Sequence, residues 1–290
     1  MNISAKESSK TGDCRLLVGT SGFSYTEWVD AGFYPSGTKT GGMLPLYARC
    51  FAITELNYTW YQMPRAETIE RQRRQAPDGF SFAAKLTRSL THEIDPQHWP
   101  EHAAQYRNGV APLVQAGQLI AVLIQMPPSF ARTPANRSYL AALIDRLHGL
   151  PLAVEFRHRS WADDRVFNEL ERRRVTLVAV DAPDLPGLFP ALDVVTNPDL
   201  FYVRFHGRNA KGWRSGNMQR QFDYSYSDDE LRCWVETGIE SMSTRARRGV
   251  LFFNNHVRAQ APENALRLIK QLIKTGKIRK KKDGTLNNPF

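Results

Sequence analysis

The stretch 152–161 joins a strand-like apolar run to charged residues that could carry chemistry. Val154 and Phe156 would share one face of a strand, and Glu155 and Arg157 the other, because successive side chains alternate. A carboxylate and a guanidinium on a buried strand need partners, since an unpaired buried charge is costly. We expect them at the open end of a closed barrel, where charges can pair and a substrate can reach them.

The same pattern, a polar residue late in an apolar run, recurs along the chain. Counting in steps of two gives a set that could face a barrel interior: Glu55, Asn57, Lys85, Gln125, Glu155, Arg157, Asp181, Arg204, His206 and Asn254. Cationic members would bind negative charge, the amides would orient a substrate, and Glu155 or His206 would move a proton. Lys85 could bind an oxyanion, form a Schiff base or pair with Glu55. A purely structural ion-pair network is the alternative for the whole set.

The loops next to these strand ends are aromatic and basic. They contain Trp161, Arg208, Lys211, Trp213 and Arg214. Aromatic faces beside cations suit a sugar, a nucleotide or a single strand of nucleic acid. Several of these rings could instead pack the loops onto the barrel.

A divalent metal is possible but is not favoured, and no cofactor is expected. Carboxylates and imidazoles are present at Glu55, Glu155, Asp181, His206 and His256. However, the chain contains no HExxH motif, and the nearby arginines and lysine would repel a cation. Phosphate-loop, dinucleotide-binding and nucleophile-elbow motifs are also missing.

Eight strand-like runs must position these residues. They lie at 16–23, 53–61, 80–87, 118–126, 152–157, 176–182, 199–206 and 249–256, with helix-like segments between them. Strict alternation favours a parallel sheet with helical crossovers, and eight repeats favour an α/β fold with a single (β/α)₈ TIM-barrel-like domain. We place that domain at 15–275, after a flexible leader at 1–14 and before a basic tail at 276–290.

Composition indicates a globular, intracellular chain. It has 290 residues with 42% hydrophobic residues and a formal net charge of +10. The three cysteines are widely spaced, which fits reduced thiols, and we find neither a signal peptide nor an apolar run of the roughly 20 residues needed to span a bilayer. We therefore expect a cytoplasmic protein without membrane contact, whose positive charge makes nucleic acid a possible partner.

Several ordered motifs together resemble the domain-of-unknown-function 72 family, also called YecE-like. They are the segments 18–23, 55–61, 82–85 with 91–92, 125–130, 154–161, 202–208 and 252–256. The resemblance implies a TIM-barrel-like fold with a polar pocket at the strand C-termini, but no known reaction. Family members often have Asn-Asn-Asp where this chain has Asn254-Asn255-His256, which removes a carboxylate.

Three functions remain open from the sequence. The leading hypothesis is an enzyme of hydrolase or isomerase/lyase type that acts on a small anionic or polyhydroxylated substrate, with Glu155, His206 and Lys85 as catalytic residues. The predicted substrate-binding residues are Glu55, Asn57, Arg157, His158, Trp161, Asp181, Arg204, Arg208, Asn254 and Asn255. The alternatives are a nucleic-acid-binding or phosphodiester-processing protein and a non-catalytic ligand-binding barrel.

Overall fold

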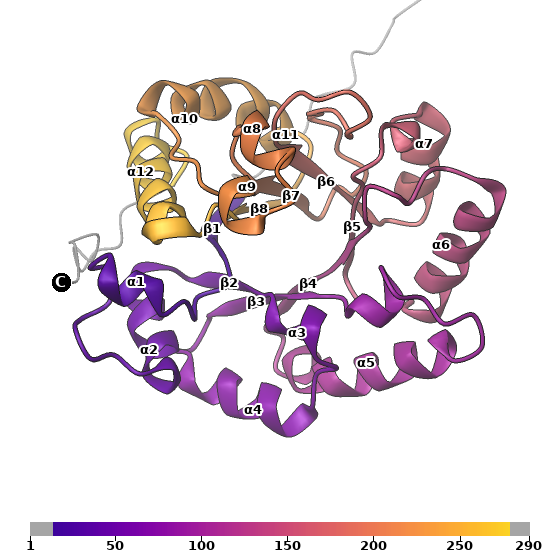
Figure 1. Ribbon diagram of the computed structural model, residues 1–290, viewed down its shortest axis with the longest axis horizontal. Coiled ribbons are helices and arrows are strands. Elements are labelled where there is room, and N and C mark those ends of the chain that lie inside the picture. The colour runs from indigo at the N-terminus through magenta and orange to yellow at the C-terminus, as the bar shows by residue number, and fades with distance from the viewer. Residues whose placement is uncertain (1–13, 279–290) are drawn as a thin grey trace, which may run out of the picture.

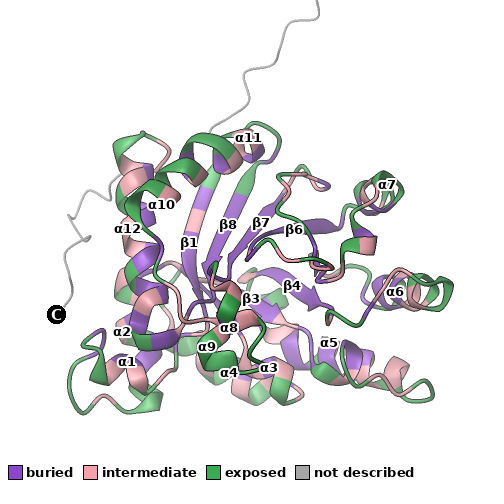
Figure 2. Cartoon of the chain, turned by 45° about the horizontal axis from the view of Figure 1, so that its top comes forward, coloured by how far each residue is buried: buried purple, intermediate pink, exposed green. Residues whose placement is uncertain are grey.

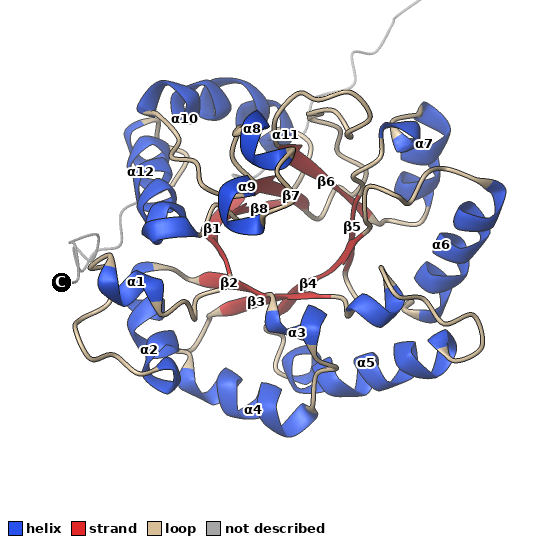
Figure 3. Cartoon of the chain, in the orientation of Figure 1, coloured by secondary structure: helices blue, strands red, loops and turns tan. Residues whose placement is uncertain are grey.

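A closed barrel of eight parallel strands forms the centre of the molecule, and helices surround it (Figures 1 and 3). The computed structural model describes residues 14–278. The strands are β1 (Arg15–Ser21), β2 (Ile53–Leu56), β3 (Ser81–Lys85), β4 (Leu119–Gln125), β5 (Leu152–Glu155), β6 (Thr176–Asp181), β7 (Phe201–Phe205) and β8 (Arg248–Phe253). The barrel closes because β1 pairs in parallel with both β2 and β8, which confirms the predicted (β/α)₈ fold.

Helices connect the strands on the outside of the barrel. The longer ones are α2 (Thr40–Cys50), α4 (Ala66–Gln75), α5 (Trp99–Gln115), α6 (Pro134–Arg146), α7 (Asp164–Arg172), α10 (Asp228–Trp234) and α12 (Gln260–Lys274). The short ones are α1 (Glu27–Asp30), α3 (Tyr58–Tyr61), η1 (Arg88–Leu90), η2 (Arg159–Trp161), α8 (Ala210–Trp213), α9 (Met218–Gln221), the π-helical turn η3 (Val235–Ile239), α11 (Glu240–Ser243) and η4 (Val257–Ala259).

Burial follows from this arrangement. The strands are almost entirely buried, whereas the surrounding helices are buried on one side and exposed on the other (Figure 2). In α12 the buried residues Ala261, Ala265, Leu268 and Leu272 recur every three or four positions, which is the spacing of one helix face. Burying each such leucine stabilises the fold by roughly 1.5–3 kcal/mol.

Two local features show how the sequence sets the element boundaries. The predicted strand 53–61 is too long: β2 ends at Leu56, and α3 follows at Tyr58. The Thr59 hydroxyl lies 2.7 Å from the carbonyl oxygen of Leu56 and 2.6 Å from that of Lys85, which fixes this turn beside the end of β3. Helix α10 begins directly after Ser227, because Ser227 and Glu230 form a reciprocal capping box.

The chain ends are largely outside the described residues. The predicted leader at 1–14 lies there except for Cys14, and so does the predicted basic tail beyond residue 278. Within the described part of the chain, no helix combines the length and the hydropathy that a membrane crossing requires.

Candidate functional site

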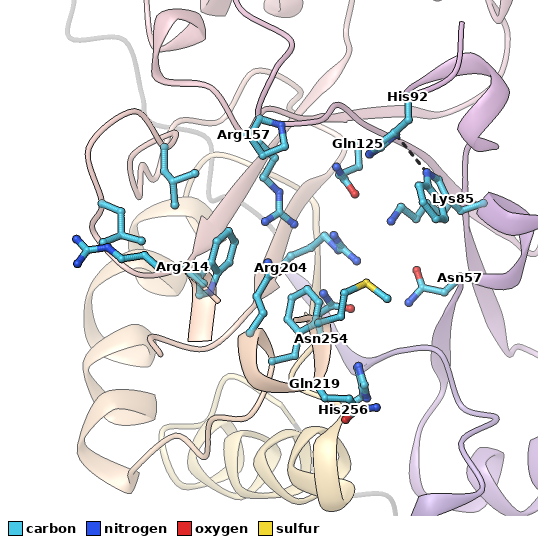
Figure 4. A pocket seen from close by; sticks show the side chains of 18 of the residues that line it. Asn57, Lys85, His92, Gln125, Arg157, Arg204, Arg214, Gln219, Asn254 and His256 are labelled. Atoms are coloured by element: carbon cyan, nitrogen blue, oxygen red, sulfur yellow. Dashed lines mark hydrogen bonds between the residues drawn. The ribbon is translucent and has the colours of Figure 1, made fainter. Parts of the chain in front are cut away.

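A cavity of about 890 Å³ opens at the C-terminal ends of the barrel strands. Strand ends supply its polar lining: Asn57, Lys85, Gln125, Arg157, Arg204 and Asn254 (Figure 4). Their common direction follows from register, because laterally paired residues of parallel strands point to the same side and side chains alternate along each strand. Glu55 pairs with Ala83, and Lys85, two residues farther along β3, faces the same interior; Asn57 lies just beyond the end of β2 and lines the cavity from there.

At the cavity floor and directly beneath it lies a group of buried charges that we call the interior ion cluster. Its members are Glu55, Glu155, Arg157, Arg204 and His206. Arg204 is its centre: Nη1 lies 2.8 Å from Oε2 of Glu155 and Nη2 lies 2.6 Å from Oε1 of Glu55. Tyr202 also donates a hydrogen bond of 2.5 Å to Glu55. The arginine therefore bridges two carboxylates that have no exposed surface.

Glu155 has a second arginine and a histidine as neighbours. Nε of Arg157 is 2.5 Å from its Oε1, and Nε2 of His206 is 3.2 Å from the same oxygen. Burial alone would raise the pKa of Glu155, but the charges of Arg157 and Arg204 outweigh burial and hold this pKa well below its usual range. Glu155 is therefore a fixed anion that orients two cations.

His206 is neutral in this setting. Burial, followed by the positive charge of Arg157, lowers its pKa to about 3. Nη2 of Arg157 lies 3.1 Å from its Nε2, and Nδ2 of Asn254 lies 3.1 Å from its Nδ1. Both ring nitrogens are thus engaged by protein groups, and the ring has no exposed surface.

Lys85 and His92 line the cavity on the side opposite Arg157 (Figure 4). Burial, followed by the positive charge of Arg204, lowers the pKa of Lys85 to about 7. Burial, followed by the charge of Lys85, lowers the pKa of His92 to about 4. Nδ1 of His92 accepts a hydrogen bond of 3.3 Å from the indole of Trp60. A base and a hydrogen-bonding imidazole therefore face the cavity itself.

Aromatic rings and amides complete the wall. The guanidinium of Arg157 lies 5.3 Å from the centroid of the Trp213 ring, so the ring covers this cation on one side. Oδ1 of Asn57 is buried and has no hydrogen-bond partner among the described residues. An unpaired buried amide oxygen is costly, which makes Asn57 ready to accept a hydrogen bond from a ligand.

Asp181 and Arg208 lie outside the cavity, contrary to the expected interior position of Asp181. Asp181 pairs laterally with Phe205, which neighbours the inward-facing Arg204 and so points outward. Its carboxylate accepts hydrogen bonds from three donors: Arg208 at 2.5 Å, Tyr226 at 2.8 Å and Trp234 at 2.5 Å. We call these four residues the outer cluster. It attaches the α10 region to the barrel.

Three further residues of the predicted binding set have structural contacts. The Asn255 amide donates to the carbonyl oxygen of Tyr224 at 2.7 Å and to Oδ1 of Asn264 at 2.8 Å. Nδ1 of His158 lies 2.8 Å from the hydroxyl of Ser160, at the start of η2. Trp161 is 3% exposed. Its ring stacks between two phenylalanines, and its indole donates to the carbonyl oxygen of Phe130 at 2.7 Å.

The carboxylates do not form a metal site. Within residues 14–278 no three His, Cys, Asp or Glu side chains gather as a ligand group. Glu55 and Glu155 direct their oxygens at Arg204, and Asp181 directs its oxygens at Arg208. A divalent cation at any of these carboxylates would have to displace a guanidinium.

Sequence reasoning missed some of the lining, above all His92 and Phe222. His92 follows η1 in a segment without strand or helix periodicity, so no spacing pattern placed it at the barrel mouth. Its contact with Trp60 of α3 joins two segments that are 32 residues apart.

Comparison with known proteins gives a consistent result. The family model described as "Protein of unknown function DUF72" matches residues 17–286. The UPF0759 protein YunF of Bacillus subtilis is 26% identical over 262 residues, covering 85% of this chain and 93% of YunF. The UPF0759 protein YecE of Escherichia coli is 27% identical over 173 residues, covering 58% of this chain and 59% of YecE.

Solved structures agree with this assignment. A DUF72 family protein from Thermotoga maritima superposes with a TM-score of 0.80 at 35% identity, covering 89% of this chain and 99% of that one. A DUF72 family protein from Enterococcus faecalis gives a TM-score of 0.80 at 28% identity, covering 89% and 95%. With its barrel, its motifs and nearly its whole length matched, this chain belongs to the DUF72 family of proteins of unknown function.

Proposed function

We propose that this chain is an enzyme that binds a small anionic, polyhydroxylated substrate in the cavity at the barrel mouth. One observation carries the proposal: among the described residues, the cavity lining contains the cations Lys85, Arg157, Arg204 and Arg214 and no carboxylate. The acids of the region lie below the floor, already paired with arginine. Because Glu55 and Glu155 offset the charges of Arg157 and Arg204, the positive potential that an anionic group would meet comes from Lys85 and Arg214.

The cavity's size and its other walls support the same class of ligand. About 890 Å³ falls within the range of roughly 300–1,000 Å³ found for small-molecule sites. The amides of Asn57, Gln125 and Asn254 offer donors and acceptors for hydroxyl groups, and Trp60 and Trp213 offer flat faces for a sugar-like backbone.

Proton transfer in this proposal belongs to Lys85 and His92 rather than to Glu155 or His206. A base with a pKa of about 7 can take and return a proton near neutral pH, and Lys85 lines the cavity. Glu155 and His206 have no exposed surface, and their contacts hold Arg157 and Arg204 in place. Their role is to position the anion-binding groups.

The nucleic-acid alternative has no specific contact in its favour. Trp161, one of the two rings proposed to stack on a base, is buried between phenylalanines. Arg208 is held by Asp181 and Glu230. Of the three basic residues expected to grip phosphates, Arg208, Lys211 and Arg214, the last two have no acid partner among the described residues.

A thermal-shift screen tests binding, because a ligand that binds only the folded state raises Tm. Purified protein is tested with phosphorylated sugars, nucleotides and single-stranded oligonucleotides at two salt concentrations. We expect a salt-tolerant shift from a phosphorylated small molecule that is lost in Arg157→Gln and in Lys85→Met. Arg208→Gln, which lies outside the cavity, is the matched control and should keep the shift.

Three other results would speak against the proposal. A shift given only by oligonucleotides and abolished by salt would favour nucleic-acid binding. No shift from any ligand would favour a structural role for the charges. A ligand that binds but stays chemically unchanged during prolonged incubation would identify the non-catalytic ligand-binding barrel.

A further inference from the structure

Among the described cations of the cavity, Lys85 and Arg214 have no acid partner, and of these two only Lys85 is partly buried and stands on a barrel strand. It is the last residue of β3, and its Nζ lies 5.0 Å from the centroid of the Trp60 ring. Within residues 14–278 no carboxylate lies within ion-pair distance of Nζ, and Nζ makes no hydrogen bond. The nearest candidates, Glu55 and Glu155, are occupied by Arg204, Tyr202 and Arg157.

The charges that face this amine explain its protonation. Burial disfavours the ammonium form first, and Arg204 and Arg157 add repulsion. Glu55 and Glu155 act in the opposite direction without offsetting these effects, so the pKa of Lys85 falls to about 7. His92, the remaining titratable neighbour, is neutral near pH 7 because its own pKa is about 4. A large fraction of Lys85 is therefore a free amine at neutral pH.

We propose that Lys85 is a nucleophile that forms a covalent imine with an anionic aldehyde or ketone bound in the cavity. This inference rests on the proposed function, since the same pocket holds the anion, and it narrows the reaction to lyase or isomerase chemistry through a carbonyl substrate. An unpaired amine in a cavity with an anion-binding guanidinium opposite is the geometry that such a reaction needs.

The chemistry balances without a redox partner. The neutral amine attacks the carbonyl carbon, a C–N bond forms, and a proton moves from nitrogen to oxygen to give a carbinolamine. The hydroxyl takes one proton from solvent and leaves as water, and the nitrogen lone pair completes the C=N bond of a protonated imine. That cation can then accept the electron pair of a neighbouring C–H or C–C bond.

His92 is placed to assist at the carbonyl oxygen. Its Nδ1 lies 3.3 Å from the Trp60 indole nitrogen and 2.8 Å from the Thr91 hydroxyl, and the neutral tautomer that accepts from the indole carries its proton on Nε2. That N–H is able to donate to the carbonyl or carbinolamine oxygen of a substrate at Lys85. The anionic group of the substrate would lie at Arg157, across the cavity (Figure 4).

Reductive trapping tests the imine directly. Full-length protein is incubated at pH 7 with pyridoxal 5′-phosphate, an anionic aldehyde, or with glyceraldehyde 3-phosphate, and then reduced with borohydride. Peptide mapping by mass spectrometry should find the secondary amine at Lys85 in excess over the exposed Lys39 and Lys211 by about tenfold or more. Lys85→Met and Lys85→Arg should each lose this adduct.

A second measurement removes any dependence on how well the probe fits. Brief labelling with formaldehyde and cyanoborohydride uses the smallest carbonyl, and its rate at Lys85 should rise with a midpoint near pH 7. Labelling of Lys85 that is no faster at pH 7 than labelling of Lys39 and Lys211 would overturn the inference, as would adducts spread evenly over the three lysines.

The failure of this inference can be told apart from failure of the proposed function. Glycerol 3-phosphate carries an anion but no carbonyl group. If glycerol 3-phosphate raises Tm in a way that requires Arg157, while no aldehyde forms an adduct at Lys85, the proposed anion site is supported and the proposed imine is wrong. If an adduct forms but no anionic ligand changes Tm, the nucleophile stands and the anion-binding proposal is wrong.

Discussion

Glu155 and Asp181 are both buried acids at the C-terminal ends of neighbouring strands, and both are paired with arginine. They differ in the side of the sheet that they face. Glu155 faces into the barrel, where its arginines line a cavity. Asp181 faces the helical layer, where Arg208, Tyr226 and Trp234 fill its acceptor positions. Glu155 and Asp181 are thus alike in burial and in pairing with arginine. The side of the sheet that each acid faces makes one part of a candidate site and the other part of a structural attachment.

The two clusters also differ in how their charges are shared. In the interior ion cluster one arginine serves two carboxylates, and the side chain of Arg204 is 1% exposed. In the outer cluster the side chain of Arg208 is 41% exposed. Its partner Asp181 also accepts hydrogen bonds from two neutral donors, Tyr226 and Trp234. Removing a cation should therefore cost much more inside than outside.

The largest expected effect is that of Arg204→Met. This change leaves Glu55 and Glu155 buried without their shared cation, which should lower the free energy of unfolding by about 3–5 kcal/mol. Urea denaturation at pH 7 measures the loss. Tyr202→Phe removes a single hydrogen bond to Glu55 and should cost about half as much. An Arg204→Met protein as stable as the wild type would show that the interior ion cluster is not held by this arginine.

The next largest effect is on stability at low pH, which should distinguish the clusters because only the interior ion cluster contains a histidine. His206 has a folded pKa of about 3, below its unfolded value of about 6.5. The unfolded chain therefore binds the proton first, and stability present above pH 6.5 is lost as the pH falls toward 3. His206→Gln should lose about 2 kcal/mol less than the wild type between pH 7 and pH 4.5.

His98 supplies the control for this measurement. Its hydrogen bond with Asp95 raises its pKa, so its contribution has the opposite sign and is lost as the pH rises. His98→Gln should therefore not reduce the acid loss. Equal acid profiles for His206→Gln and the wild type would mean that protonation of His206 does not limit stability.

The alternation of strand side chains predicted most of the site. It placed Glu55, Glu155, Arg157, Arg204 and His206 together because each of β2, β5 and β7 carries its polar residues in steps of two. In these strands the polar residues therefore indicate which side faces the barrel interior. The prediction of eight β/α repeats was confirmed for the same reason: apolar runs and helical periodicity are local signals.

Alternation failed for Asp181 because the four residues before it, Leu177 to Val180, are apolar on both faces of β6 and so do not mark the inward side. Lateral pairing with Phe205 determines that Asp181 faces outward, and this pairing is a property of the folded sheet. Asn254 and Asn255 could not both face the cavity, since adjacent residues of an extended chain diverge. His92 was missed because its place depends on a contact with Trp60 of α3, 32 residues away in the chain.

The smallest effect, and the strictest test of the comparison, is that of Arg208→Met. Asp181 keeps the donors of Tyr226 and Trp234, and the guanidinium of the lost ion pair is 41% exposed and so partly screened by solvent. Unfolding should therefore become easier by only about 1 kcal/mol. Because this residue lies outside the cavity, the ligand-induced rise in Tm and the trapping of Lys85 should both equal those of the wild type. A loss of either, in a variant that unfolds normally, would make the outer cluster part of the site and would remove the distinction between the two faces of the sheet.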